Sequence, residues 1–295
     1  MDVRVRPMRP EDLDEVAAVT FAAFLTVELR HGHDPAFRSV HAARNLCGAY
    51  LRYPESRPFV AVADGRVVGA AFLHPRGATA GVGPVAVDPS AQGTGVGRRL
   101  MERLLREAGA KTSVRLVQAA FNRSSFSLYT RLGFQVRDAL ATVVSGHRLD
   151  VPPAAGPVTA VDGAGLEPVA RLDEAATGIR RAGDLSFLTH VGTTFVAGDP
   201  AAPDGYLCRL STGDTHYLGP AVARDEATLR DLMAAALRDA TEGTVVARVP
   251  ARHQTLLADV LGWGLRVGTV GTYMVRGPWR EPEAAWLLPT FPESL

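Results

Sequence analysis

The second half of the sequence repeats the pattern of glycines, prolines and apolar residues of the first half, and this repeat constrains the fold more than any other feature. Gly83-Pro84 has a counterpart in Gly219-Pro220. The helix-like segment RLMERLLREA ends at Ala108, and the similar segment DLMAAALRDA ends at Ala240. The spacing between these counterparts is far longer than the period of solenoid repeats. The repeat therefore predicts a duplicated domain.

A third matching segment sets the expected domain boundaries. Leu132-Gly133-Phe134 matches Leu261-Gly262-Trp263. Between the copies, residues 151–159 are rich in proline and glycine, which is typical of a linker. We therefore expect two domains, residues 1–150 and 151–295, each long enough to bury a core of its own.

Composition excludes several classes of protein. The 295 residues carry 32 Lys and Arg against 31 Asp and Glu, so no basic excess is available for nucleic acid. The N-terminus lacks a signal-peptide pattern, and no apolar run is long enough for a membrane helix. Cys47 and Cys208 are too few for a disulfide framework. We expect a cytoplasmic protein. All but one of the Lys and Arg residues are arginine, which suggests a GC-rich bacterial genome.

The first copy alternates between strand and helix patterns. Residues 3–9 alternate like a half-exposed strand, and two amphipathic stretches, 11–29 and 35–52, favour helices. Asp64-Gly65 between two apolar runs predicts a hairpin turn. The remaining patterns predict strands over 59–63, 67–73, 81–89, 114–120 and 134–146, and helices over 98–108 and 124–132.

A glycine-rich loop lies between the predicted strand 81–89 and the next helix. Backbone N–H groups at a helix start bind anions, and glycines let a phosphate approach closely. Arg98 and Arg99 add positive charge to this segment. The spacing fits neither the dinucleotide fingerprint nor a P-loop. By itself the loop indicates an anion site or a turn that needs glycine. Its residues are Gln92, Gly93, Thr94, Gly95, Val96 and Gly97.

Two motifs together resemble the GCN5-related N-acetyltransferase (GNAT) family. Gln92-x-x-Gly95-x-Gly97 after the segment PVAVDP is similar to the family's pyrophosphate loop. The segment AAFNRSSFSLYTRLGF, residues 119–134, is similar to its second signature. The order of elements over residues 3–144 agrees, and the whole chain resembles tandem members whose second copy is degenerate.

The resemblance implies an α/β (α+β) fold with two GNAT-like domains, each a mixed, mainly antiparallel sheet flanked by helices. It implies a gap between the strands at 82–88 and 114–120, where acetyl-CoA binds. The pantetheine would pair with the backbone of Val85, Ala86 and Val87, and the pyrophosphate would lie on Gly93–Arg98. No metal is implied.

The same resemblance gives roles to Asn122 and Tyr129. Both match family positions that contact the cofactor near its thiol, and Tyr129 would be the general acid for the departing thiolate. A phenol with a pKa of about 10 can protonate a thiolate whose parent thiol has a pKa of about 8.5. A tyrosine that only packs against the sheet is the alternative.

The second copy is expected to be inactive. With the offset of the third matching segment, Asn122 and Tyr129 fall on Ala251 and Ala258. An acidic pair, Asp225-Glu226, stands where the first copy has glycines. Carboxylates at a helix start satisfy its free N–H groups and repel a diphosphate. The second domain is therefore interpreted as structural or as shaping the substrate cleft.

The general base is not evident from the sequence. The strand at 81–88 lacks the Glu that family enzymes often use. Glu28, His31, His33 and Asp34 cluster between the first two helices, which border the acceptor pocket in this family. These residues are base candidates or solvated loop residues. A zinc site is not supported by a short polar loop alone.

The sequence thus predicts an acetyl-CoA-dependent N-acetyltransferase that acts on a primary amine of a small molecule or peptide, by direct transfer in a ternary complex. A non-catalytic acyl-CoA-binding sensor or partner protein is the alternative. No nucleophile motif such as Gly-x-Ser-x-Gly is present. The apolar tail 286–295 is expected to pack on the surface, and the oligomeric state is unknown.

Overall fold

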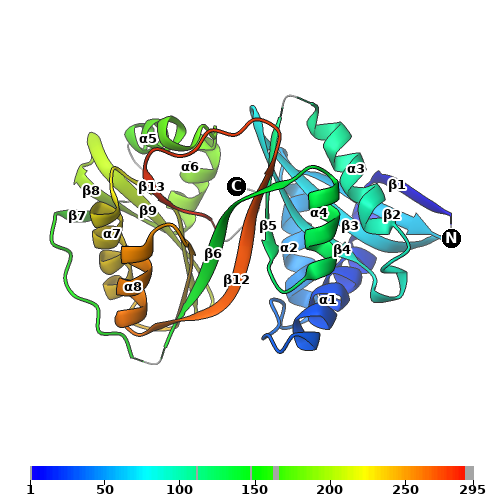
Figure 1. The fold of residues 1–295 in the computed structure, drawn as a ribbon, viewed down its shortest axis with the longest axis horizontal. Helices are drawn as coiled ribbons and strands as arrows, with labels where there is room; N and C mark the ends of the chain where they lie inside the picture. Colours follow the sequence, from blue (N-terminus) through cyan, green and yellow to red (C-terminus); the bar gives the residue numbers. More distant parts are fainter. Residues whose placement is uncertain (1, 111, 147, 162–165, 290–295) are drawn as a thin grey trace. The chain divides into compact units, whose positions relative to one another are not determined.

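The described residues divide into two units (Figure 1). The computed structural model describes residues 2–110, 112–146, 148–161 and 166–289. Unit 1 holds the residues up to Gln135 together with Met274–Pro278. Unit 2 holds Val136–Tyr273 and, in the last described stretch, residues 279–289.

Unit 1 is built on a sheet in the order β1-β2-β3-β4-β5, in which only the β4–β5 pair is parallel. Its elements are β1 (Val3–Pro7), η1 (Pro10–Asp12), α1 (Leu13–Arg30), α2 (Val40–Arg52), β2 (Arg57–Ala63), β3 (Arg66–Arg76), β4 (Thr79–Val87), η2 (Pro89–Ala91), α3 (Val96–Ala108), β5 (Ser113–Ala119) and α4 (Arg123–Arg131).

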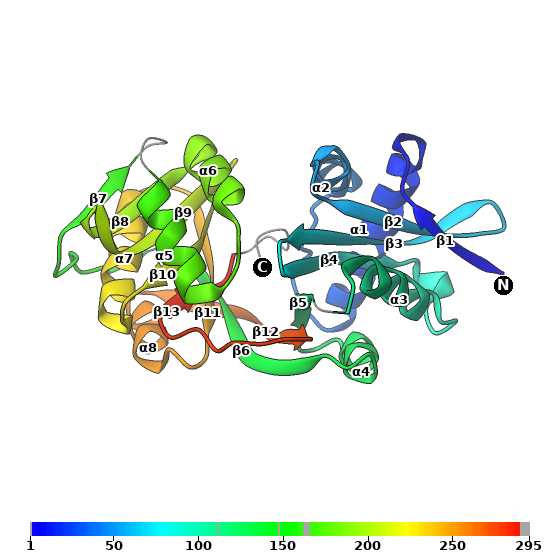
Figure 2. The same ribbon diagram turned by 90° about the horizontal axis from the view of Figure 1, so that it is seen from above.

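Helices cover both faces of this sheet. Figure 2 shows α1 and α2 on one side of the strands and α3 on the other. Helix α3 buries Leu100, Met101 and Leu104 in the core, as the helical spacing of its apolar residues predicts. Asp64 and Gly65 both have positive φ angles in the β2–β3 turn, which confirms the predicted hairpin.

Unit 2 has the same plan, with a sheet in the order β6-β11-β10-β9-β8-β7 and one parallel pair, β10–β11. Its elements are β6 (Gln135–Ser145), β7 (Val158–Val161), α5 (Glu167–Thr177), α6 (Ala182–Val191), β8 (Thr193–Asp199), β9 (Ala202–Thr212), β10 (Thr215–Ala223), α7 (Glu226–Asp239), β11 (Thr244–Pro250), α8 (Gln254–Gly262), β12 (Leu265–Arg276) and β13 (Ala285–Leu287).

The two Gly-Pro pairs lie at equivalent places. In unit 1, β4 carries one extra residue relative to β3 at Gly83-Pro84, because Ala71 pairs with Val85 but Leu73 pairs with Val82. In unit 2, β10 carries the same bulge relative to β9 at Gly219-Pro220. A bulge at the same point of both sheets confirms the duplication in three dimensions.

The structure corrects the alignment of the later elements of the two copies. Helices α4 and α8 are equally long, and each is followed by a glycine with positive φ. That glycine is Gly133 after α4 and Gly264 after α8, so the sequence match of Gly133 with Gly262 is out of register. The N-cap residues Asn122 and His253 are therefore equivalent.

The equivalents predicted for the two signature residues change with this register. Asn122 corresponds to His253, and Tyr129 corresponds to Val260 on α8. The predicted equivalents Ala251 and Ala258 are wrong. The triplets Leu132-Gly133-Phe134 and Leu261-Gly262-Trp263 misled the alignment because they match in sequence but not in structure. Leu132 follows the last residue of α4, whereas Leu261 lies within α8.

Two strands explain why the units do not divide at residue 150. Strand β6 follows unit 1 along the chain but pairs with β11 of unit 2. Strand β12 begins in unit 2, and its last residues, from Met274, belong to unit 1. The repeat seen in the sequence and the compact units of the fold therefore have different boundaries.

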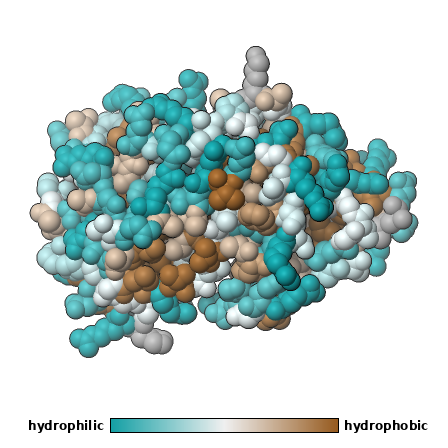
Figure 3. All heavy atoms as spheres, in the orientation of Figure 1, coloured by the Kyte–Doolittle hydropathy of each residue, from teal (hydrophilic) through white to brown (hydrophobic). Residues whose placement is uncertain are grey.

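Strand β12 also presents apolar residues to solvent. Val267 and Val270 expose 43% and 45% of their surface. Figure 3 shows apolar atoms gathered over this part of unit 2, on a surface that is otherwise mostly hydrophilic. Residues three apart in a strand point to opposite faces, so both faces of this part of β12 reach solvent.

Candidate functional site

Strands β4 and β5 separate after a short stretch of parallel pairing. Among the described residues, they pair only at Thr79–Gly81 and Ser113–Arg115. Beyond Gly81, β4 continues to Val87 and pairs with β3 alone. Within the described chain, one edge of Val85–Val87 thus has no strand beside it. Backbone groups on such an edge need partners, so the edge can accept an extended ligand as an added strand.

A buried histidine contacts the bulge that precedes this open edge. His74 on β3 is fully buried, and its Nε2 donates a hydrogen bond to the carbonyl oxygen of Gly83 at 2.8 Å. The ring of Tyr50 on α2 lies edge-on, 4.7 Å from the imidazole. Unit 2 has Leu210 at the position of His74 and still forms the bulge.

The glycine loop leads directly into the start of α3. Gly93 and Gly95 have φ angles of 80° and 90°, in the left-handed region that glycine tolerates. The N-cap of α3 is Gly95, and among the described residues no side chain caps this helix. The free N–H groups of the first turn therefore remain available to an anion. Thr94 and Gln92 hold the loop through hydrogen bonds to the carbonyl oxygens of Ala91 and Val87.

The two arginines after the loop have different roles. Arg99 donates to the carbonyl oxygen of Val3 at 2.8 Å, so its charge lies at β1. The prediction that Arg99 adds positive charge to the glycine loop is therefore wrong. Arg98 pairs with Glu102 at 2.8 Å and is well exposed. An exposed i,i+4 pair contributes only about 0.3–0.5 kcal/mol, so Arg98 can be redirected to a ligand at little cost.

Asn122 is the N-cap of α4. Its Oδ1 accepts a hydrogen bond from the backbone N–H of Ser125 at 3.2 Å. Gln118 on β5 donates to the carbonyl oxygen of Asn122 at 2.8 Å. The cap fixes the turn that follows β5 and leaves the amide nitrogen of Asn122 to donate to a ligand. Its predicted contact with the cofactor stays a prediction.

Tyr129 lies on α4 and is buried in the core of unit 1. Burial raises the pKa of its hydroxyl to about 12. Its ring packs 5.8 Å from that of Phe134. Among the described residues, none forms a hydrogen bond with this hydroxyl. It is therefore protonated at neutral pH. Its predicted role as the general acid stays a prediction.

The loop between α1 and α2 reaches the end of β5. The His33 ring stacks on Phe121, which directly precedes Asn122, at a centroid distance of 4.2 Å. His31 Nδ1 donates to the Val27 carbonyl oxygen at 2.7 Å, so in the neutral ring Nε2 is the acceptor. The predicted loop cluster thus lies beside the second signature segment.

Glu28 is the buried member of that cluster. Its Oε2 accepts a hydrogen bond from the Ala36 N–H at 2.9 Å, which closes the loop. Burial raises the pKa of this carboxyl group, and the hydrogen bond from Ala36 only partly offsets the shift. A carboxylate held this way is a stronger base than an exposed one.

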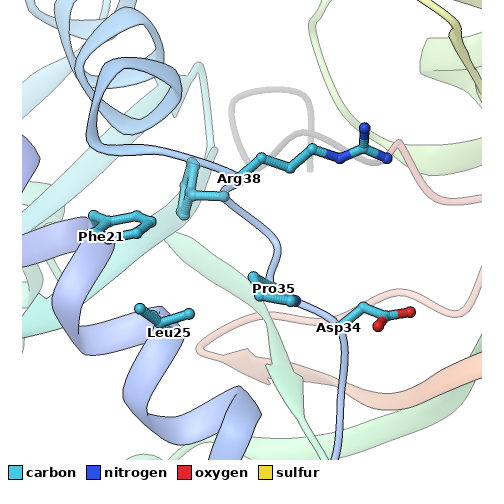
Figure 4. A pocket seen from close by; sticks show the side chains of 6 residues that line it. Phe21, Leu25, Asp34, Pro35 and Arg38 are labelled. Atoms are coloured by element: carbon cyan, nitrogen blue, oxygen red, sulfur yellow. The ribbon is translucent and has the colours of Figure 1, made fainter.

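A cavity of about 510 Å³ opens beside the same loop (Figure 4). Helix α1 supplies apolar side chains to it, and the loop supplies the charged ones, Asp34 and Arg38. The sequence singled out only Asp34, because the other lining residues carry no chemical motif. The lining consists of Phe21, Leu25, Asp34, Pro35, Phe37 and Arg38.

The corresponding helix start in unit 2 is already capped. Asp225 Oδ1 accepts from the Thr228 N–H at 2.8 Å, and this hydrogen bond lowers the pKa of the carboxyl group. Arg224 pairs with Asp225 as well. The carboxylate of Asp225 therefore occupies the start of α7 that an anion would otherwise bind, as the sequence predicts. Val260, at the position of Tyr129, supplies no acid.

The described residues contain no group of three or more His, Cys, Asp or Glu side chains placed to hold a metal ion. Among them, no helix is long and apolar enough to cross a membrane.

Family models match both units. The model of the acetyltransferase (GNAT) family matches residues 24–134, and the model of an acetyltransferase (GNAT) domain matches residues 169–285. No curated protein matches the chain by sequence.

Solved structures share the fold over nearly the whole chain. A crystal structure from Pyrococcus horikoshii has a TM-score of 0.77 at 15% identity, over 99% of this chain and 95% of that one. A GCN5-related N-acetyltransferase from Sphaerobacter thermophilus has a TM-score of 0.62 at 18% identity, over 95% of this chain and 98% of that one. A tandem GNAT protein from the clavulanic acid biosynthesis pathway has a TM-score of 0.63 at 18% identity, over 95% of this chain and 100% of that one.

Proposed function

The chain belongs to the acetyltransferase (GNAT) family, and from this premise we propose that unit 1 transfers an acetyl group from acetyl-CoA to a primary amine of a small molecule or peptide. The observation that carries the proposal is the open edge of Val85–Val87, which leads through the glycine loop to the uncapped start of α3. A backbone edge suits the amides of pantetheine, and a free helix start suits a diphosphate.

Acetyl-CoA supplies an activated thioester when bound. The backbone of Val85, Ala86 and Val87 holds its pantetheine in this proposal, and Gly93–Arg98 hold its pyrophosphate. The N–H groups beside the bulge polarise the thioester carbonyl, and Tyr129 donates its proton to the departing sulfur. Glu28 takes one proton of the acceptor ammonium group, directly or through water. The second proton, which the nitrogen loses as the amide forms, returns Tyr129 to its protonated state.

The cysteines support direct transfer over a covalent acetyl-enzyme. Cys47 and Cys208 are both fully buried, and burial raises the pKa of the Cys47 thiol to about 11 and that of Cys208 to about 12. A thiol nucleophile needs the opposite shift, because only the thiolate attacks. The acceptor amine therefore attacks the thioester itself, in a ternary complex.

The test is release of free CoA from acetyl-CoA across a panel of amino acids, aminoglycosides, polyamines and peptides with free N-termini. Amine-dependent release that Gly97→Glu abolishes supports the proposal. Tight CoA binding with no release above the rate without amine would instead favour a non-catalytic acyl-CoA-binding protein.

A further inference from the structure

The last strand of the chain lies in the gap of unit 2. Strand β13 pairs antiparallel with β10, with Val222 opposite Trp286 at the centre of the pairing. The next residue after the strand, Leu288, forms a bridge with Arg248 of β11. The segment Ala285–Leu288 therefore contacts both strands of the parallel pair, beyond the point at which they separate.

This location is equivalent to the open edge of unit 1. Because the bulges of β4 and β10 coincide, Ala221–Ala223 correspond to Val85–Val87. Those three residues of β10 are the ones that pair with β13. In the described part of unit 1, by contrast, no segment pairs with Val85–Val87 on that side. Unit 2 thus has a peptide strand where unit 1 has a free edge.

The segment is seated by burial and by a specific hydrogen bond. Trp286, Leu287 and Leu288 expose only 5%, 1% and 3% of their surface. The Trp286 N–H donates to Nε2 of His253 at 3.2 Å, and His253 is the counterpart of Asn122. The strand therefore reaches the residue that corresponds to the predicted thiol end of the cofactor site.

The bulge of β10 also leaves room for the segment. A Cβ atom on Gly219 would lie 2.7 Å from the carbonyl oxygen of Leu288, closer than side chains approach backbone. The glycine of the repeated Gly-Pro pair is therefore needed in unit 2 to admit the tail.

We propose that the gap between β10 and β11 is a groove for an extended peptide, and that its resident ligand is the chain's own segment Ala285–Leu288. The segment replaces acyl-CoA in unit 2. The identity of the replaced ligand rests on the proposed function, whereas the occupation of the gap does not. Because the strand is tethered and buries three large apolar side chains, free CoA does not displace it.

Hydrogen exchange on the full chain tests this proposal, with and without CoA. We expect the amides of residues 285–288 to exchange at least about 1,000-fold more slowly than in an unstructured peptide. CoA should leave this protection unchanged. Exchange within about tenfold of the peptide rate, or loss of protection when CoA is added, would overturn the proposal.

The same experiment separates this inference from the proposed function. If unit 1 binds no CoA, residues 85–87 gain no protection when CoA is added, whereas the protection at 285–288 is unaffected. Ala285→Pro supplies a variant, because it removes an N–H and adds a ring at the first residue of the strand, opposite Ala223. It should speed exchange at 286–288 at least about 100-fold, while Ala284→Pro, just outside the strand, should not. Equal increases in the exchange rates of both variants would contradict the proposal. If Ala285→Pro does not fold, the exchange rates of the wild type at 285–288 decide.

Discussion

The imidazole of His33 stacks on the ring of Phe121, with 4.2 Å between the ring centroids. This contact joins the loop after α1 to the turn after β5, two segments that are far apart in the sequence. The loop that closes on Glu28 therefore lies next to the residues predicted to reach the thiol of the cofactor. The proposed base, Glu28, and the proposed acid, Tyr129, are thereby on neighbouring segments of one unit.

Glu28→Gln should lower kcat by at least about tenfold, because the amide cannot accept a proton from the acceptor ammonium group. Gln keeps an oxygen for the Ala36 N–H, so the loop should remain closed. The rate of the wild type should rise with pH through a value above the usual glutamic acid range, since burial raises the pKa of Glu28. The variant should lose this rise in its pH–rate profile.

Stability provides the control for Glu28. Folding raises the pKa of this carboxyl group, so the folded chain favours its protonated form. The stability that the protonated form adds is lost as the pH rises through the pKa of the folded state. Glu28→Gln should therefore leave Tm unchanged or slightly higher at pH 8. A lower Tm with normal turnover would assign Glu28 a structural role only.

Tyr129→Phe should reduce kcat by at least about tenfold and change KM for acetyl-CoA little, because it removes the donated proton and keeps the ring. With a pKa of about 12, the hydroxyl should cause no alkaline decline in rate below pH 10. Steady-state kinetics with the best amine of the panel measure both quantities. Unchanged kcat in the folded variant would assign the proton to another group or to water.

Gly97→Glu should weaken CoA binding at least about 100-fold, because it brings a carboxylate to the first turn of α3. Gly97 is a better position than Gly95, whose φ of 90° would add backbone strain. A Cβ on Gly97 meets Leu128 at 3.4 Å and Val87 at 3.5 Å, which are near-normal contacts. Calorimetry should show near-normal binding for Gly97→Ala. Normal binding by the Glu variant would place the diphosphate elsewhere.

The sequence was informative wherever local chemistry decides the structure. Glycines with positive φ, an Asp-Gly turn and a helical apolar stripe predicted the loop, the hairpin and α3 correctly. The acidic cap of α7 was also predicted, because Asp225 satisfies its helix start through a bond to the nearby Thr228. Such features depend on neighbours in sequence, so one chain suffices to recognise them.

The features that the sequence missed depend on distant segments. The tail 286–295 was expected on the surface, but Trp286, Leu287 and Leu288 are buried in unit 2, and residues 290–295 lie outside the described residues. The partners of this segment on β10 are far away in the sequence, and so short a strand has no detectable period. Arg99 was misplaced for a similar reason, because its partner is the carbonyl oxygen of Val3.

Unit 2 contains a buried ion pair that should be critical for its stability. Arg181 and Asp173 form two hydrogen bonds of 2.8 and 2.7 Å, and the Tyr206 hydroxyl donates to the same carboxylate. Arg181→Met leaves a buried charge uncompensated and should cost about 3–5 kcal/mol in unfolding free energy. The neighbouring exposed pair, Arg180 with Glu174, gives the control, since Arg180→Met should cost less than about 1 kcal/mol. Urea denaturation that gives equal losses would contradict this assignment.

Calorimetric titration of the full chain with CoA distinguishes the two units, because among the described residues a strand pairs with the edge beside the bulge in unit 2 and none does in unit 1. We predict one CoA per chain, bound by unit 1 through the edge of Val85–Val87 and the start of α3. Two sites per chain would show that β13 does not close unit 2. No binding at millimolar CoA would show that unit 1 is not an acyl-CoA site.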